Sequence, residues 1–241
     1  MNPPRPALAL LLCALAACST SAPQRPAAPE AAVAPKVVRV DVWHDLVCPW
    51  CRMGLHNLDA AVAGLKDVRV EVVHHAYQLE PGAPQSGTDM RRHLEEQFGA
   101  DKVDAMLARV TQAGAQSGVV FHWDAVKVSP NTAAAHALVE WAPRGKRSAV
   151  VAGLHRAHFD EGKNLGDPEV LAAVAAAAGL DGAAARGAVQ DPSRLDGVRA
   201  AGQAASARGI TGVPYYEVGG RVLRGSQSAA APTETLKAAA R

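Results

Sequence analysis

Two short segments in the first third of the chain have the pattern of β-strands. Residues 37–43 alternate apolar and polar side chains over much of their length and are rich in valine, and residues 68–73 repeat this pattern. Between them, apolar residues recur at helical spacing from Cys48 to Leu65. The order strand, helix, strand predicts a βαβ unit whose two strands are parallel.

The pattern becomes helical over residues 88–189, and no strand signal of comparable strength interrupts it. Two helices in this stretch are expected to begin where a capping residue precedes a proline, at Ser129-Pro130 and at Asp167-Pro168. Asp191-Pro192 has the same form and opens a further helix that ends at Gly209. We therefore expect a large block of helices after the βαβ unit.

After this block the chain returns to strands. Residues 214–218 and 221–224 flank Gly219-Gly220, which is typical of a hairpin with a two-residue turn. Residues 233–240 are expected to form a short closing helix.

The order of elements predicts an α/β protein: a thioredoxin fold with a large all-helical domain inserted after the first βαβ unit. We expect the thioredoxin domain to comprise residues 37–86 and 190–241, and the helical insertion to comprise residues 87–189.

Residues 1–17 have the form of a lipoprotein signal peptide. Their apolar run is too short to cross a bilayer, which takes roughly twenty residues, and it ends in Leu15-Ala16-Ala17-Cys18. This ending resembles a bacterial lipobox, whose cysteine is lipidated and becomes the mature N-terminus. The alternative is an ordinary secretory signal with an incidental cysteine.

Residues 18–36 are rich in proline and alanine and have no amphipathic period, so we expect a tether. The protein is then lipid-anchored in the bacterial cell envelope. Because serine rather than aspartate follows Cys18, we expect the outer membrane, with the folded domain facing the periplasm.

Charge and composition narrow the classes of partner. The 241 residues include 25 Lys+Arg and 23 Asp+Glu, with 4% aromatic residues and no long basic run, so nucleic acid is not an expected partner. Four cysteines are too few for a disulfide framework in a chain of this length. Cys13 lies in the expected signal peptide and Cys18 is expected to carry lipid, which leaves Cys48 and Cys51 as thiols.

Cys48-Pro49-Trp50-Cys51 falls where the first strand leads into the first helix. Unpaired N–H groups and the helix dipole stabilise a thiolate at Cys48, and Pro49 suits the first helical turn. Cys51, one turn further, is placed to resolve a mixed disulfide. The same spacing also occurs in zinc sites, but such a site needs two more ligands and no second CxxC is present, so no metal is expected. A buried cysteine pair without a role is the remaining alternative.

Further motifs accompany the pair: residues 45–51 with Gly54, 129–132 with His136, 155–159, 162–167, 179–181 and 209–214. Together they resemble, over residues 37–228, the DsbA-like thioredoxin superfamily. Within it they resemble the FrnE-type branch, which is related to 2-hydroxychromene-2-carboxylate isomerases and kappa-class glutathione transferases. The resemblance implies that Pro214 is cis and packs beside the cysteine pair, and that Val213 offers backbone hydrogen bonds to an extended substrate.

Several residues next to the two cysteines in the sequence also have expected roles. Pro49 and Trp50 are expected at the substrate-binding site, although Trp50 is equally typical of a core tryptophan. Arg52 departs from the branch, in which an aromatic residue commonly follows this pair. Asp45 is expected to have a loop or capping role rather than to shuttle a proton to Cys51, and His56 is expected at the surface.

These features predict a thiol-disulfide oxidoreductase that exchanges disulfides with thiol-containing envelope proteins and works with a redox partner protein. No cofactor is expected beyond the redox-active Cys48–Cys51 pair. One alternative is a glutathione-dependent isomerase or transferase acting on a small aromatic substrate. Since such relatives typically carry serine at the position of Cys48, the two cysteines favour dithiol chemistry. Another alternative is a non-catalytic thioredoxin-fold binding lipoprotein.

Overall fold

The computed structural model describes residue 1, residues 36–66 and residues 68–241 of the chain. The expected signal peptide after Met1, the lipidation site Cys18 and the tether up to residue 35 lie outside the described residues. Residues 36–241 belong to one compact unit. Within residues 36–66 and 68–241, no helix combines the length and the apolar character that a membrane span requires.

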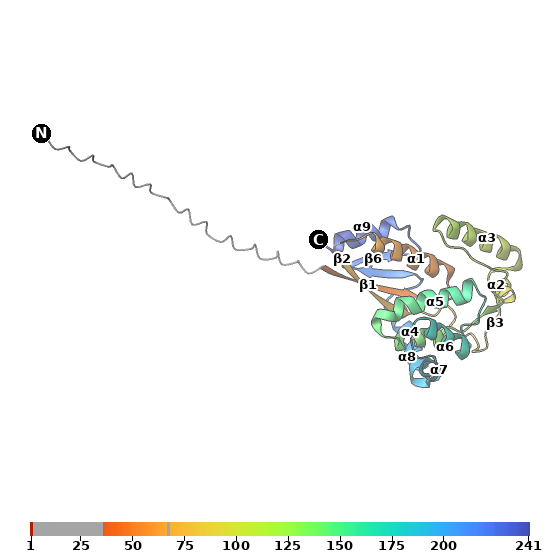
Figure 1. Ribbon diagram of the computed structural model, residues 1–241. Helices are drawn as coiled ribbons and strands as arrows, with labels where there is room; N and C mark the ends of the chain where they lie inside the picture. The colour runs from red at the N-terminus through yellow and green to blue at the C-terminus, as the bar shows by residue number, and fades with distance from the viewer. Residues whose placement is uncertain (2–35, 67) are drawn as a thin grey trace. The chain divides into compact units, whose positions relative to one another are not determined.

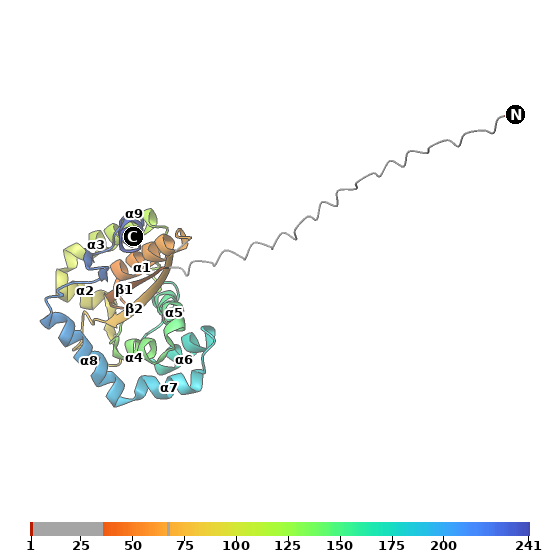
Figure 2. The ribbon, with the colours of Figure 1, turned by 90° about the vertical axis from the view of Figure 1, so that its left-hand side faces the viewer.

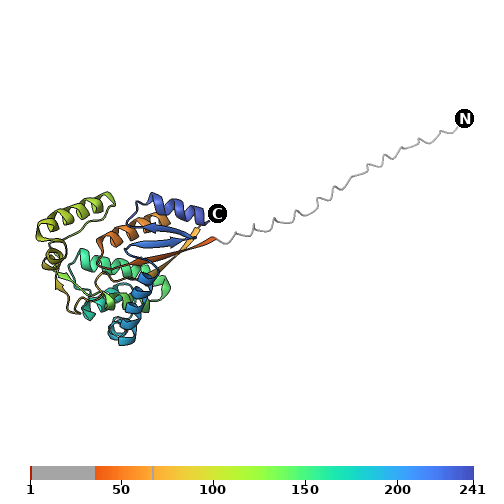
Figure 3. The same ribbon diagram turned by 180° about the vertical axis from the view of Figure 1, so that it is seen from behind.

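A four-stranded mixed sheet with the order β2-β1-β5-β6 forms the centre of this unit (Figure 3). β1 (Lys36–His44) pairs in parallel with β2 (Val68–Ala76) and antiparallel with β5 (Tyr215–Val218). The antiparallel β6 (Arg221–Arg224) follows a turn in which Gly219 and Gly220 both have positive φ, as a two-residue hairpin turn requires. The predicted βαβ unit and hairpin are both confirmed.

Helices cover the two faces of the sheet. α1 (Pro49–Ala63) and α9 (Ala230–Ala239) lie together on one face (Figures 1 and 2). The other face is covered by α4 (Ala133–Trp141), α5 (Arg147–Phe159), α6 (Pro168–Ala177), α7 (Gly182–Gln190) and α8 (Pro192–Ala207), with a 3₁₀ turn at Arg144–Lys146. α2 (Met90–Phe98) and α3 (Ala100–Gln116) lie on the side of α1, at the end of the sheet.

The predicted fold, a thioredoxin fold with a large helical insertion after the first βαβ unit, is confirmed. The structure adds one feature to the insertion, a two-residue antiparallel ladder between β3 (Thr88–Asp89) and β4 (Val128–Ser129). The domain boundaries given above stay predictions.

Two predicted helix starts are confirmed and one is wrong. Asp167 and Asp191 cap their helices, because their carboxylates accept the backbone N–H groups of Glu169 and Ser193. The helix expected at Ser129-Pro130 begins instead at Ala133. Here Ser129 pairs with Thr88 in the short ladder, and the side-chain oxygen of Asn131 accepts the Ala133 N–H at 2.9 Å, so local hydrogen bonds delay the helix. The closing helix begins at Ala230, three residues earlier than expected.

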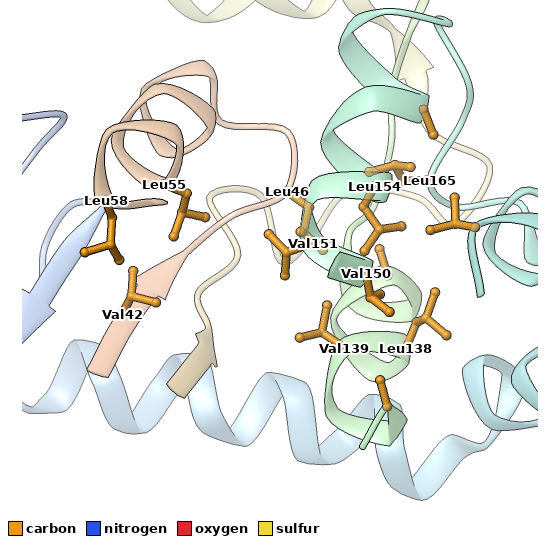
Figure 4. Close-up of a cluster of buried hydrophobic side chains, with 14 of the residues drawn as sticks. Val42, Leu46, Leu55, Leu58, Leu138, Val139, Val150, Val151, Leu154 and Leu165 are labelled. Carbon is orange, nitrogen blue, oxygen red and sulfur yellow. The ribbon is translucent and has the colours of Figure 1, made fainter. Parts of the chain in front are cut away.

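The hydrophobic core runs without a break from the thioredoxin half into the insertion (Figure 4). Val42, Leu55 and Leu58 of β1 and α1 belong to the same buried cluster as Leu46 in the loop between them. Leu138, Val139, Val150, Val151, Leu154 and Leu165 extend it into the insertion. Because protein cores are close-packed, this continuity fixes the insertion against the strand-to-helix loop that carries the cysteines.

Candidate redox-active site

Cys48 and Cys51 lie at the start of α1, and both are thiols in this structure. Cys48 is the N-cap residue, with extended backbone dihedral angles, and Pro49 occupies the first turn. The backbone oxygen of Cys48 accepts the N–H groups of Cys51 and Arg52, each at 3.1 Å. The Cys48 side chain therefore lies at the N-terminus of α1, where the helix dipole favours negative charge.

Cys51 is completely buried, whereas Cys48 has 4% of its surface exposed and borders the groove described below. Burial raises the pKa of the Cys51 thiol well above its ordinary value, and the nearby Cys48 raises it further. Asp45 acts in both directions, because its backbone N–H lowers this pKa and the charge of its carboxylate raises it. The two sulfurs are thus unequal. Cys48 is suited to be a nucleophile and leaving group, whereas Cys51 holds its proton until a base removes it.

The loop before β5 closes over this pair. The Val213-Pro214 peptide bond is cis, and the Cys48 Sγ lies 4.0 Å from the carbonyl oxygen of Val213. The cis-proline and its place beside the cysteines, both implied by the family resemblance, are present. Gly54 permits this approach, since a Cβ atom there would lie 3.0 Å from Pro214 Cγ and would overlap the hydroxyl of Tyr216.

Asp45 lies beneath Cys51 with only 1% of its surface exposed. One carboxylate oxygen accepts the Leu46 N–H and the other accepts the Leu79 N–H, each at 2.7 Å. Its own backbone N–H donates to the Cys51 Sγ at 3.5 Å. Asp45 therefore does not cap α1, which has no side-chain cap. It joins two loops to each other and to the buried cysteine.

The carboxyl of Asp45 also faces His136 of α4, whose Nε2 lies 3.4 Å from its Oδ1. Burial raises the pKa of Asp45, but His136 and the backbone N–H donors outweigh this effect and hold the pKa below its ordinary value. The sequence offered a signal for this contact, because His136 and Asp45 belong to motifs that accompany the cysteine pair. Only the folded structure shows that the two side chains are close to each other.

Arg52 ties α1 to the helical insertion. Its guanidinium pairs with Asp160 at 2.8 Å and lies over the rings of Phe121 and Phe159, 5.3 and 5.4 Å from their centroids. The arginine thus contacts aromatic residues at the position where the related branch commonly has an aromatic residue itself.

A groove of about 320 Å³ opens beside Cys48, and Pro49 and Trp50 line it together with the cysteine. α2 and α3 form its other wall at the end of the sheet where β1 leads into α1 (Figure 1). Most of the lining is apolar and includes Met90, Leu94, Phe98, Met106, Leu107, Val110 and Trp123. Trp50 is half-buried in the groove lining. Val213, also half-buried, and Pro214 lie in the cis-proline loop and are not among the lining residues. The groove can accept an apolar segment next to a cysteine.

Among residues 36–66 and 68–241, five histidines are buried, a feature that the sequence pattern did not indicate: His44, His74, His136, His155 and His158. Burial lowers the pKa of His44 well below its ordinary value, that of His74 and of His158 to about 4, and that of His155 to about 3. His74 and the adjacent His75 face opposite sides of β2, as expected for neighbours on a strand, since His75 contacts Asp41 and stacks on Trp43. His56 is exposed, as expected.

Within residues 36–66 and 68–241, no three His, Cys, Asp or Glu side chains are grouped as ligands of a metal ion. The two His74 ring nitrogens instead contact His44 and Ser148. His44, His74 and Ser148 therefore form a hydrogen-bonded group.

Comparisons with known proteins identify the family and the fold of the chain. The sequence model of the DsbA-like thioredoxin domain family matches residues 39–237. The uncharacterised protein YwbO of Bacillus subtilis is 27% identical over 191 residues, which are 78% of this chain and 90% of that protein. A probable DsbA oxidoreductase from Streptomyces coelicolor is similar in structure, with 28% identity, a TM-score of 0.73 and coverage of 84% of this chain and 89% of that one.

The fold is also similar to that of a 2-hydroxychromene-2-carboxylate isomerase, with 15% identity and a TM-score of 0.60 over 78% of this chain and 89% of that one. The resemblance expected from the motifs is confirmed for fold and family.

Proposed function

Because the chain belongs to the DsbA-like thioredoxin domain family, we propose that it is a thiol-disulfide oxidoreductase that exchanges disulfides with proteins through Cys48 and Cys51. The observation that carries the proposal is the inequality of the two sulfurs. Cys48 lies at the N-terminus of α1 beside the cis-Pro214 loop and the groove, and Cys51 is fully buried behind it.

In the oxidising direction, a substrate thiolate attacks the Cys48 sulfur of the Cys48–Cys51 disulfide. A substrate–Cys48 bond forms, the bond to Cys51 breaks, and the Cys51 thiolate leaves with the electron pair and takes up a proton. A second substrate thiolate then attacks the substrate sulfur of the mixed disulfide, and Cys48 leaves as a thiolate stabilised by the helix N-terminus. The substrate has lost two electrons and the cysteine pair has gained them, so a redox partner protein must reoxidise the pair.

The groove supports a protein substrate. Its lining is mostly apolar, so it favours an extended segment whose cysteine is flanked by apolar side chains. Titratable lining residues besides Cys48 are Glu80, His93 and His158, and no lysine or arginine is among the described residues of the lining. Glutathione carries two carboxylates that such a lining would leave without a cationic partner, which disfavours the alternative of a glutathione-dependent enzyme.

The cellular setting rests on the sequence alone. The lipobox-like ending at Cys18 and the proline-rich tether support a lipid-anchored protein on the outer membrane, facing the periplasm and acting on envelope proteins. Fractionation of cells that express the full chain tests this. We expect wild type in the membrane fraction and Cys18→Ser outside it; equal partition of the two would contradict lipidation at Cys18.

The activity is tested by following oxidation of a peptide with two cysteines and apolar flanking residues by the oxidised protein. Wild type is expected to form the peptide disulfide and Cys48→Ser to be inactive. Exchange that is unchanged in Cys48→Ser would overturn the proposal. Isomerase or transferase turnover that requires glutathione and survives Cys51→Ala would support the alternative enzyme class instead.

A further inference from the structure

A line of buried side chains leads from Asp45 to the protein surface. The Asp45 Oδ1 lies 3.4 Å from the Nε2 of His136, whose ring is 5.7 Å, between centroids, from that of His44. The Nε2 of His44 lies 3.1 Å from the Nδ1 of His74, and the Nε2 of His74 lies 3.0 Å from the hydroxyl of Ser148. Ser148 is exposed at the start of α5, so the line ends in solvent.

The cysteine chemistry creates a need for such a line. Cys51 is completely buried and must lose a proton before it can attack a mixed disulfide. Asp45 is the acidic residue in contact with it, since its backbone N–H donates to the Cys51 sulfur and the charge of its carboxylate acts on the thiol. Because Asp45 is itself buried and both its oxygens accept backbone N–H groups, it has no direct contact with bulk water through which to pass the proton on.

Histidine is suited to this task because one ring nitrogen can accept a proton while the other donates one. His74 already uses both ring nitrogens in contacts along the line. His44 uses Nε2 toward His74, and its Nδ1 has no hydrogen-bond partner among residues 36–66 and 68–241. The Nε2 of His136, which faces Asp45, likewise has no hydrogen-bond partner among these residues, so each of the two rings has an unpaired nitrogen.

We infer that His136, His44 and His74 conduct a proton between Asp45 and solvent at Ser148 whenever Cys51 is deprotonated or reprotonated. The inference rests on the proposed function. It assigns to His44 and His74, more than one side chain away from the sulfurs, the role of positioning residues for proton transfer.

The resolving step shows the balance. The Cys51 S–H bond breaks and its proton passes to the Asp45 carboxylate. The Cys51 thiolate attacks the Cys48 sulfur of the mixed disulfide, the Cys48–Cys51 bond forms, and the substrate thiolate leaves with the electron pair. Asp45 then passes the proton to His136, and one proton leaves the line of histidines at Ser148. The cysteine pair is oxidised by two electrons and the substrate disulfide is reduced.

The reaction of the reduced protein with 5,5′-dithiobis(2-nitrobenzoate) separates these steps. Attack by Cys48 releases a first coloured thiolate, and resolution of the resulting mixed disulfide by Cys51 releases a second. The leaving group departs without a proton, so the second phase reports deprotonation of Cys51. The test variants are His44→Leu and His74→Leu, and the matched control is His155→Leu, which removes an equally buried histidine outside the line.

We expect His44→Leu and His74→Leu each to slow the second phase on the order of tenfold or more and to leave the first phase unchanged. The double variant is expected to be no slower than the slower single variant, because both changes interrupt one path. His155→Leu is expected to keep the wild-type rate. The reduction potential is expected to stay constant in all variants, since a proton path changes rates and not equilibria.

A wild-type second phase in both single variants would overturn the inference. So would an equal loss in His155→Leu, or a reduction potential that shifts together with the rate, because each would indicate a general effect on packing. Failure of the proposed function looks different: the wild-type protein itself would then show no second phase.

Discussion

The backbone N–H of Asp45 donates to the Sγ of Cys51 at 3.5 Å, while the carboxylate of the same residue is held by the N–H groups of Leu46 and Leu79. One buried residue thus contacts Cys51 and joins the loops after β1 and β2. This arrangement links the chemistry of Cys51 to the stability of the fold.

Asp45→Asn is expected to lower both the stability of the fold and the rate at which Cys51 reacts. The asparagine amide would place an NH₂ group against a backbone N–H that now finds a carboxylate oxygen, which costs about 1–3 kcal/mol of unfolding free energy. The loss of the carboxylate is also expected to slow resolution by Cys51. Urea unfolding and the second phase of the nitrobenzoate reaction measure the two effects. Wild-type stability and rate in this variant would show that the carboxylate neither stabilises the fold nor assists the reaction of Cys51.

The buried histidines are expected to make the fold sensitive to acid. Burial lowers the pKa of His74 and His158 to about 4 and that of His155 to about 3, whereas in the unfolded chain each returns to its ordinary 6.5. Below that value the unfolded state binds more protons than the folded state. The free energy of unfolding therefore falls as the pH drops from about 6.5 toward 4, by up to about 1.4 kcal/mol per pH unit for each such histidine.

Urea unfolding across this pH range measures the slope. His74→Leu is expected to reduce it, and the exposed His56 provides the control, since His56→Leu is expected to leave it unchanged. A free energy of unfolding that stays constant from pH 6.5 to 4 would show that these histidines are not neutral in the folded protein.

Gly54 is expected to be required for the approach of α1 to the cis-proline loop. In Gly54→Ala the new methyl group would overlap Tyr216 and press on Pro214, so we expect a loss of about 1–3 kcal/mol of unfolding free energy and slower disulfide exchange. Gly64→Ala near the other end of α1 is a matched control, because its Cβ would meet its nearest atom, the Ala61 oxygen, at an ordinary 3.5 Å. Equal stabilities of the two variants would contradict tight packing at Gly54.

The pair of Arg52 and Asp160 is expected to stabilise the junction between α1 and the insertion. A double-mutant cycle with Arg52→Met and Asp160→Asn is expected to give a coupling energy of about 1 kcal/mol in urea unfolding, because both side chains are largely removed from solvent. The same cycle on the exposed pair of Arg92 and Glu96 should give a coupling close to zero. Equal coupling in both cycles would argue against a special role of Arg52.

The groove is expected to select apolar substrates. Leu107→Lys, which places a charge in its lining, is expected to raise KM for a peptide with apolar residues around its cysteine by about tenfold, at an unchanged rate with a small-molecule disulfide. Ala108→Lys on the exposed side of the same helix is the control. A peptide KM that is the same in wild type and Leu107→Lys would place substrate binding elsewhere.

The features that could be predicted from the sequence are those determined by short-range rules. Gly219-Gly220 specifies its hairpin turn, and Asp167 and Asp191 cap their helices, because each acts on residues next to it in the chain. Cys48 at a helix start follows the same logic. The start of α4 was missed because Ser129 pairs with Thr88, forty-one positions away, and a single sequence carries no signal for that contact.

The histidine cluster shows the same limit within the site. His44, His74 and His136 come from β1, β2 and α4, and only the folded sheet and insertion bring them together. Side chains alternate along a strand, so one of His74 and His75 must face inward. This alternation did not indicate that the inward ring would meet His44.

The central claim is that Cys48 is the sulfur that bonds to substrate and Cys51 the one that resolves the bond. Trapping with a cysteine-containing apolar peptide disulfide, followed by peptide mapping by mass spectrometry, tests it most directly. Cys51→Ser is predicted to accumulate a stable peptide adduct on Cys48, and Cys48→Ser to form none. An adduct on Cys51 in Cys48→Ser at a comparable rate, or no adduct in Cys51→Ser, would contradict the account.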